Sequence, residues 1–432
     1  MRKENRIICK KTKQNNNRRK TKKHKKEEIK KMQNRNEGIT LIALIITIII
    51  LLILVGVSIN LAIKGDLFGS AEKAVSGTND KTAQEQTRVD ELMGELGRVE
   101  EQQRQDNLPG TRVTENTKYV SNGKTAWIPK GFTVSGIKSE QSIDNGLVIY
   151  DIPEGTTPDW SNPDSVKTKY NQFVWIPVEV KSTDTENSIE SFYRSKWAEN
   201  TATGGERTTG LSTDYTEPDS TNDTADKTGI AGQITELTKS IYKYGGFYIG
   251  RYEAGSKTER TSSSSQTAEF VVQQDKYPYN YVKWGKSMSD VSEGAVYLCN
   301  NLYTPTNTNY GATSMLCTGA TWDSMLDFIK DSSHSVTNST NWGNHSNSKT
   351  YKVYRGSLYV YNISTSTYTW STADATAGTD VTQGRHILLT TGAAETRNVA
   401  KNIYDVAGNM YEWTTESYSS DIRVGRGRFL RR

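Results

Sequence analysis

The chain has 432 residues, of which 34% are hydrophobic, and its formal net charge is +5. This length allows about two or three domains with a substantial core. The low apolar content, together with abundant Ser, Thr, Asn and Gly, argues against a compact helical enzyme and favours a loop-rich β protein. The basic charge is local, because residues 1–37 carry 16 Lys and Arg against 4 Glu. The rest of the chain is therefore mildly acidic.

Residues 1–38 form a basic leader. A run such as CKKTKQNNNRRKTKKHKK could bind nucleic acid. However, it lacks interleaved aromatic residues, and an apolar segment follows it directly. We interpret the leader as the signal that holds one end of a membrane helix in the cytoplasm, and we predict no nucleic-acid partner.

Residues 39–64 are predicted to be a transmembrane helix in contact with membrane lipid. The 25 residues from Ile39 to Ile63 contain no charged side chain. At 1.5 Å per residue they would extend about 37 Å, enough to cross a hydrocarbon core of about 30 Å. A secretory signal peptide would have a shorter apolar core. The leader predicts a single-pass protein of the cell membrane with a cytoplasmic N-terminus and an extracellular C-terminal domain.

The stretch EG-ITLIALIITIIILLILVGVSI resembles the N-terminus of type IV prepilins and pseudopilins. The resemblance implies a bacterial protein that a prepilin peptidase cuts after Gly38, with methylation of the new terminal residue Ile39. It also implies other pilin-like subunits as partners. The family usually has Glu at the fifth mature position, where this chain has Ala43. That departure weighs against filament assembly but not against membrane anchoring.

Residues 65–110 are predicted to form a polar helical stalk followed by a hinge. Four apolar residues recur there at a spacing of three and four: Val89, Leu92, Leu96 and Val99. This makes two heptads, fewer than the three or four that are typical of a coiled coil. Pro109 and Gly110 cannot continue a helix and are expected to end it.

Residues 111–432 are predicted to form an α+β domain with short strands, long loops and two helices. Asn122-Gly123, within TKYVSNGKTAWIP, is a strong hairpin signal. Residues 181–240 are polar and are interpreted as a long insertion. One helix is expected to begin with Asp290 and Glu293 as a capping box, and the other to be capped by Thr321. The segment YKVYRGSLYVYNIS is expected to be a hairpin.

Four segments of this domain, in order, resemble the formylglycine-generating enzyme, or sulfatase-modifying-factor, family. They are GGFYIGRYEAG, YPYNYVKWGKSMSDVSEGAVYLCNNLY, GATWDSMLDFIKD and NIYDVAGNMYEWTTE. The resemblance implies a C-type-lectin-like fold, in which loops are displayed on a small twisted sheet. This branch contains oxidases and also binding proteins, so the fold alone does not determine the activity.

The segment DVAGNMYE is a candidate calcium site. Gly408 can adopt a positive φ, so that backbone carbonyls turn inward beside the carboxylates of Asp405 and Glu412. Oxygen donors that converge in this way suit Ca²⁺. The resemblance implies ligation by Asp405, Gly408, Met410 and Glu412. The alternative is that Asp405 and Asn409 only cap a turn.

The oxidases of this family carry a cysteine pair, with copper, after an R-G-G-[SW] motif. Here Arg426-Gly427 match the start of the motif, Arg428 replaces the second glycine, and no cysteine follows. We therefore predict neither catalytic residues nor a copper site, and we expect a truncated or frame-shifted C-terminus. Cys299 and Cys317 lie elsewhere. They could form a disulfide, or they could be two buried thiols.

The sequence favours a membrane-anchored, outward-facing surface protein whose lectin-like domain binds an unknown extracellular ligand without catalysis. A first alternative is a minor pilin or pseudopilin of a type IV pilus or type II secretion-like system, against which Ala43 weighs. A second alternative is an oxidase of the formylglycine-generating type whose catalytic end is missing. The lack of the cysteine pair weighs against it.

Overall fold

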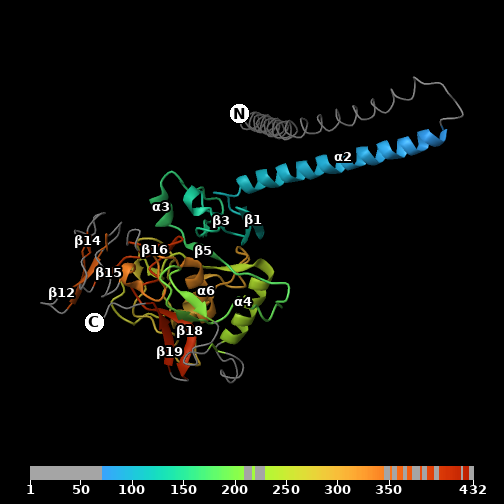
Figure 1. Cartoon of the computed structure of the whole chain (residues 1–432). Coiled ribbons are helices and arrows are strands. Elements are labelled where there is room, and N and C mark those ends of the chain that lie inside the picture. Colours follow the sequence, from blue (N-terminus) through green and yellow to red (C-terminus); the bar gives the residue numbers. More distant parts are fainter. Residues whose placement is uncertain are drawn as a thin grey trace, which may run out of the picture. The chain divides into compact units, whose positions relative to one another are not determined.

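The structure is a computed structural model. It describes residues 71–208, 217–218, 229–344, 351–352, 358–362, 367–371, 380–381, 387–393, 398–419 and 422–427. The chain divides into two compact units, Met1–Leu96 and Gly97–Arg432. The described helices and short strands confirm the α+β class (Figure 1).

The predicted leader, the predicted span 39–64 and the predicted processing residues Gly38 and Ile39 all lie outside the described residues. Within the described part of the chain, no helix combines the length and the apolar character that a membrane span requires.

The predicted helical stalk is confirmed. Helix α2 runs from Ala71 to Asp106 and ends directly before the segment with Pro109 and Gly110. Gly110 has φ +79°, a left-handed conformation that a helix cannot use. The four apolar residues of the predicted seam are all exposed, with exposed fractions of 39% for Val89, 55% for Leu92, 43% for Leu96 and 63% for Val99.

A four-stranded antiparallel sheet organises the domain. Its order is β3-β4-β5-β8, with β3 at Thr133–Val134, β4 at Val148–Tyr150, β5 at Gln172–Pro177 and β8 at Gly246–Gly250. Val148 and Val174 pack in one buried cluster, whereas Ile149 and Trp175 pack in another. Successive side chains of a strand point to opposite faces, so this one sheet serves two cores.

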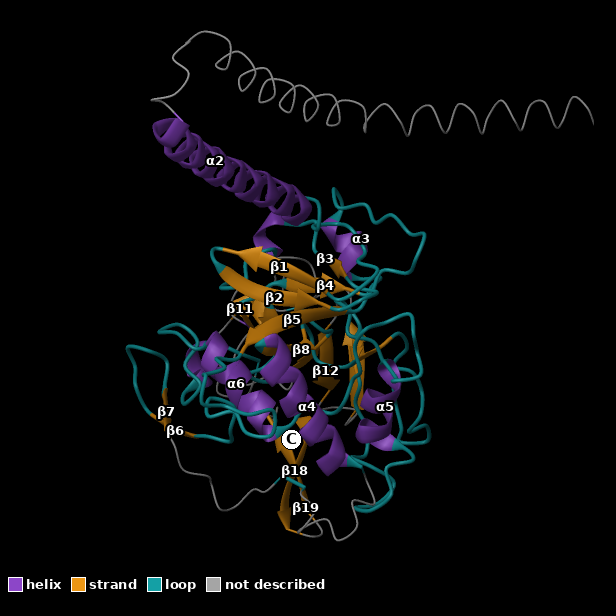
Figure 2. Cartoon of the chain, turned by 90° about the vertical axis from the view of Figure 1, so that its right-hand side faces the viewer, coloured by secondary structure: helices purple, strands orange, loops and turns teal. Residues whose placement is uncertain are grey.

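Two hairpins lie at opposite ends of the domain (Figures 1 and 2). The first joins β1, Thr117–Ser121, to β2, Lys124–Ile128, and confirms the predicted hairpin. Asn122 and Gly123 between them have φ of +51° and +75°, as a two-residue hairpin turn requires. The second joins β18, Glu412–Ser419, to β19, Ile422–Arg426.

Helix α4, Ile230–Tyr244, is a correction to the predicted insertion at 181–240. Its apolar residues Ile230, Ile234, Leu237 and Ile241 repeat at helical spacing and pack into the core clusters. The hairpin of β6, Lys196–Ala198, and β7, Glu206–Thr208, also lies in that region. The polar composition of the region concealed this periodicity.

The two predicted helices exist, but their caps differ from the prediction. Helix α5, Gly294–Leu302, has Glu293 as its N-cap without a side-chain hydrogen bond, so the predicted capping box is wrong. Helix α6, Gly319–Ile329, is capped by Thr318, and Thr321 supplies the other half of a capping box. The hydroxyl of Thr318 accepts from the N–H of Thr321 at 3.0 Å.

The remaining elements are short. They are α3 Pro163–Lys167, β9 Gly255–Ser256, β10 Tyr277–Pro278, β11 Tyr351–Lys352, β12 Leu358–Asn362, β13 Thr367–Ser371, β14 Asp380–Val381, β15 Ile387–Leu389, β16 Val399–Ala400 and β17 Ile403–Tyr404. The hairpin predicted for YKVYRGSLYVYNIS is wrong, because β11 pairs with β14, and β12 pairs with β13 and β15. A local pattern indicates which residues share a face of a strand but not which strand pairs with it.

Candidate functional site

The main feature of the domain is a cavity of ≈ 1640 Å³. Its walls come from β5, β8, α4, α5, the segment 303–318 and the segment 403–413. The lining is mostly aromatic and aliphatic, with Phe173, Trp175, Tyr248, Phe270, Leu298 and Tyr303 among its members. A concave, apolar surface with a few polar groups is the usual form of a ligand pocket.

Aromatic side chains stand at the mouth of the cavity. Tyr281 and Tyr411 line it and are 47% and 54% exposed. Tyr281 has φ +55°, which is a strained conformation for a bulky residue. The indole N–H of Trp413, another lining residue, donates to the backbone carbonyl of Val282 at 3.0 Å. This bond ties the C-terminal segment to the residue that follows Tyr281.

Several polar atoms in the cavity wall are buried without a hydrogen-bond partner among the described residues. They are Trp175 Nε1, Tyr252 Oη, Asn280 Oδ1 and Asn300 Oδ1, and all four residues line the cavity. Buried polar groups normally have a partner in the protein, in water or in a ligand. The residues of the wall therefore hold one N–H donor, one hydroxyl that can donate or accept, and two carbonyl acceptors that have no partner among the described residues.

Three carboxylates, at or near the cavity wall, interact electrostatically: Glu253, Asp405 and Glu412. Glu253 follows β8, is 5% exposed and accepts a hydrogen bond from Asn409 Nδ2. Asp405 accepts from the N–H of Gly392 at 2.7 Å and from Asn398 Nδ2 at 2.8 Å. Glu253 and Glu412 line the cavity, and Glu412 is half-buried.

The electrostatics of this group show that the three carboxylates interact. Burial, and then the charge of Asp405, raises the pKa of Glu412 to about 8. Burial raises the pKa of Asp405 to about 7, although the hydrogen bonds from Gly392 and Asn398 oppose it. Burial and the charges of Asp405 and Glu412 raise the pKa of Glu253 well above its usual range. These directions are typical of like charges buried together.

The predicted calcium ligands come together only in part. Asp405 and Glu412 are neighbours, and Gly408 has the expected positive φ, at +124°. The carbonyl of Gly408 accepts from the N–H of Met410 at 3.0 Å, and both oxygens of Asp405 already accept from amide groups. No group of three or more His, Cys, Asp and Glu side chains suited to a metal occurs among the described residues.

The turn itself is also bonded to other loops. Asn409, with φ +64°, accepts at Oδ1 from the N–H of Leu389 at 2.8 Å and from Asn344 Nδ2 at 3.0 Å. A side chain at Gly408 would collide with the backbone of Asn344, so glycine is required there. The described side-chain bonds of Asp405 and Asn409 therefore join the turn to other segments and do not cap the turn itself. Calcium binding at Asp405 and Glu412 stays a prediction.

Cys299 and Cys317 are both free, so the structure has the two thiols rather than the disulfide. Cys317 Sγ lies 3.1 Å from Thr321 Oγ1, whereas Cys299 packs beside the cluster of Ile230 and Trp284. Burial raises the pKa of the Cys299 thiol to about 12, and that of Cys317 is also raised. Both residues line the cavity, but neither is a thiolate near neutral pH.

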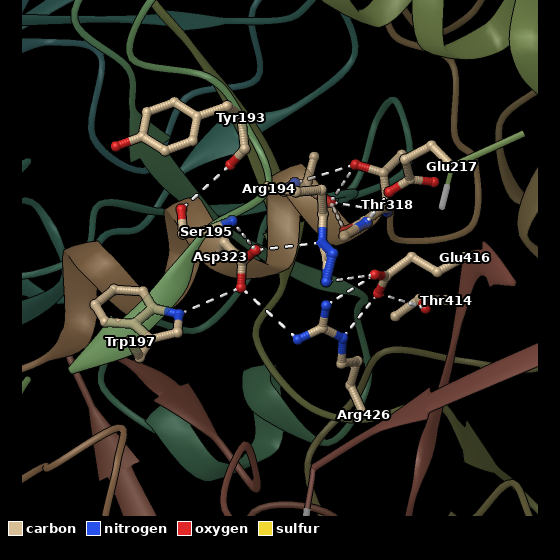
Figure 3. A network of polar contacts seen from close by, with 12 residues as sticks. Tyr193, Arg194, Ser195, Trp197, Glu217, Thr318, Asp323, Thr414, Glu416 and Arg426 are labelled. Atoms are coloured by element: carbon tan, nitrogen blue, oxygen red, sulfur yellow. Dashed lines mark hydrogen bonds and ion pairs between the residues drawn. The ribbon is translucent and has the colours of Figure 1, made fainter. Parts of the chain in front are cut away.

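A buried ion network lies behind the wall that Thr318 and Thr321 contribute (Figure 3). Arg194 Nη2 lies 2.7 Å from Glu416 Oε1, and Arg194 Nε lies 3.3 Å from Asp323 Oδ2. Arg426 Nε lies 2.7 Å from Glu416 Oε2, and Arg426 Nη1 lies 3.7 Å from Asp323 Oδ1. Two guanidinium groups thus balance two carboxylates, and Arg426 holds β19 to β18 and α6.

Glu217 adds a fifth ionisable group to this network (Figure 3). It accepts from the N–H of Gly319, at the start of α6, and from the hydroxyl of Thr415 in β18. Burial, and to a lesser extent the charge of Glu416, raises the pKa of Glu217 to about 7. Glu217 therefore joins α6 to β18 and changes its charge near neutral pH.

The sequence interpretation did not single out Glu253, Tyr281 or Tyr411. Glu253 lies in GRYEAG, shortly after the end of β8. The signal that the sequence offered was an acidic residue following an apolar run. No signal in the sequence indicated Tyr281, whose position at the mouth depends on a positive φ.

The chain matches no family model, no curated protein and no solved structure. The resemblances to prepilins and to the sulfatase-modifying-factor family, and the C-type-lectin-like fold that the second resemblance implies, therefore stay predictions.

Proposed function

We propose that this chain is a membrane-anchored surface protein whose C-terminal domain binds an extracellular ligand in the cavity without catalysing a reaction. The main observation that supports this proposal is the cavity. Its ≈ 1640 Å³ is larger than the roughly 300–1,000 Å³ of a typical small-molecule pocket, so it suits an extended ligand such as a peptide segment or a short glycan.

The anchor and the fold are part of the same proposal. Residues 39–64 would cross the membrane with the basic leader in the cytoplasm, which places the cavity outside the cell. A C-type-lectin-like arrangement agrees with short strands, long loops and a cavity at the surface of the domain. Calcium at Asp405 and Glu412 would neutralise two of the buried carboxylates beside the cavity.

A binding role agrees with the chemistry of the cavity wall. The two thiols that line it, Cys299 and Cys317, both have a raised pKa, so neither is poised as a nucleophile. The wall instead supplies aromatic surface and unpartnered polar atoms. These features favour recognition of a ligand over activation of one.

The proposal predicts that filling the cavity weakens binding. Ser240 is exposed and lines the cavity from α4, so Ser240→Trp would put an indole ring into it. Thr235 is exposed on the same helix but does not line the cavity, so Thr235→Trp is the matched control. The probe is 2-naphthylmethanol, titrated by fluorescence into the full-length chain in nanodiscs of zwitterionic lipid, with empty discs as the blank.

We expect Ser240→Trp to weaken binding of the probe about tenfold and Thr235→Trp to leave it unchanged, because only the first residue displaces volume from the cavity. Equal binding by both variants would contradict the proposal, as would the lack of any saturable binding to the unaltered chain.

A further inference from the structure

The described residues that line the cavity carry an unbalanced charge. Three carboxylates, Glu236, Glu253 and Glu412, face one guanidinium, that of Arg423. Glu236 has its own partner, because Lys239 Nζ lies 2.8 Å from its carboxylate. The guanidinium of Arg423 donates to the carbonyl of Met288 at 2.9 Å and lies 4.0 Å from the ring centroid of Trp284. Lys239 and Arg423 thus each have a described partner other than Glu253 and Glu412.

Glu253 is the clearest case of a carboxylate without a cation. It is 5% exposed, it lines the cavity, and its described hydrogen bond comes from the neutral amide of Asn409. Arg251 lies only two residues away in the chain, but its guanidinium is bonded to Glu140 at 2.8 Å. A buried carboxyl group without a counter-charge favours its neutral form, and a cation that enters the cavity would favour the ionised form and pair with it.

The surroundings of Glu253 suit an organic cation. The aromatic residues Tyr281, Tyr411 and Trp413 line the same cavity, and the faces of such rings attract ammonium and guanidinium groups. The rings of Tyr252 and Tyr279 also line it, but Arg251 and Arg260 of the protein already lie over them. Tyr252 Oη and Asn280 Oδ1 are buried without partners and can accept N–H donors. Both residues also line the cavity, and Tyr252 is itself 3% exposed.

We propose that the ligand carries an ammonium or guanidinium group, as a lysine-rich or arginine-rich peptide does, and that this group binds at Glu253 against the aromatic lining. The inference rests on the proposed function, since it assigns the chemistry of the ligand of the same cavity. Calcium, if it binds, uses Asp405 and Glu412 and leaves Glu253 to the ligand.

The test compares two probes of nearly equal shape, 2-naphthylmethylammonium and the neutral 2-naphthylmethanol. Both are titrated into the full-length chain in the same nanodiscs, with a chelator present. We expect the ammonium probe to bind about tenfold more tightly, because charge-assisted hydrogen bonds are the stronger ones. In Glu253→Gln the preference should fall to about twofold or less, while the neutral probe keeps its affinity.

Glu236→Gln is the matched control, since Glu236 lines the same cavity but is already paired with Lys239. It should keep the full preference for the ammonium probe. The proposal is overturned if both probes bind equally to the unaltered chain, or if Glu253→Gln retains the preference. It is also overturned if about 1 mM calcium abolishes the preference, because the carboxylates would then serve a metal. If neither probe binds, the proposed function fails as well.

Discussion

Two groups of buried carboxylates in this domain differ in one respect, the presence of a cation. Glu140 is 2% exposed, and it lies 2.8 Å from Arg251 Nη2 and 3.0 Å from Lys167 Nζ. Burial alone would raise the pKa of Glu140, but the charges of Arg251 and Lys167 lower it to about 2. Glu253, which is buried, and Glu412, which is half-buried, interact with Asp405 and have no such cation among the described residues, and desolvation raises the pKa of both.

The comparison distinguishes a carboxylate whose charge is neutralised within the protein from carboxylates that are available to bind a cationic ligand. The hydroxyl of Tyr150 donates to Glu140 at 2.9 Å and that of Ser135 at 2.7 Å, so every part of the Glu140 carboxylate is bonded within the protein. The group at Glu253 has neutral donors only. Glu140 and Glu253 are similarly buried, so the missing cation decides the sign of the pKa shift at Glu253.

The largest effect is expected when the main cation, Arg251, is removed from the paired carboxylate, Glu140. Arg251→Met would leave Glu140 buried without its main partner and would also remove the bonds to Tyr150 Oη, at 3.2 Å, and Gln172 Oε1, at 3.1 Å. Loss of one partner of a buried pair costs about 3–5 kcal/mol, so we expect the free energy of unfolding in urea to fall by that amount.

The double variant Glu140→Gln, Arg251→Met is the control, because it removes the carboxylate together with its main partner. It should be more stable than Arg251→Met alone. If Arg251→Met costs less than about 1 kcal/mol, the pair does not stabilise the domain and the comparison fails.

A smaller effect is expected at Glu217, which is half-buried beside a charge-balanced network. Its pKa is raised from 4.5 in the unfolded chain to about 7 in the folded domain, so the folded state binds the proton more tightly. Stability from this group is therefore present below about pH 4.5 and is lost as the pH rises to about 7, by about 3 kcal/mol in total.

Glu217→Gln should remove that pH dependence. The difference in unfolding free energy between the unaltered chain and the variant, measured by urea unfolding from pH 4.5 to 8, should shift by about 3 kcal/mol in favour of the variant. Parallel pH profiles would mean that Glu217 is not buried against Gly319 and Thr415 in solution.

Local features of the fold could be predicted from the sequence, whereas the lack of a cation beside Glu253 could not. Asn122-Gly123 predicted the β1–β2 hairpin because the turn is encoded by adjacent residues. The meeting of Asp405 and Glu412 was also predicted, because only a turn separates them. The state of Glu253 depends on Arg251, whose partner Glu140 lies 111 positions away in the chain. A sequence motif does not show which of two neighbouring carboxylates an arginine selects.

Calcium binding gives the smallest expected effect. It distinguishes the carboxylates without a cation from one another, because Asp405 and Glu412 are predicted ligands and Glu253 is not. If Asp405 and Glu412 hold the ion at a dissociation constant of about 10⁻⁴–10⁻³ M, about 1 mM calcium should raise the free energy of unfolding by about 1 kcal/mol. Glu412→Gln should abolish this gain, whereas Glu253→Gln should keep it, since Glu253 lies outside the predicted ligand set. The gain should grow as the pH rises toward about 8, where Glu412 loses its proton and can bind the ion. If Glu253→Gln abolishes the gain as Glu412→Gln does, the carboxylates act as one metal site, and the cationic group of the ligand must bind elsewhere in the cavity.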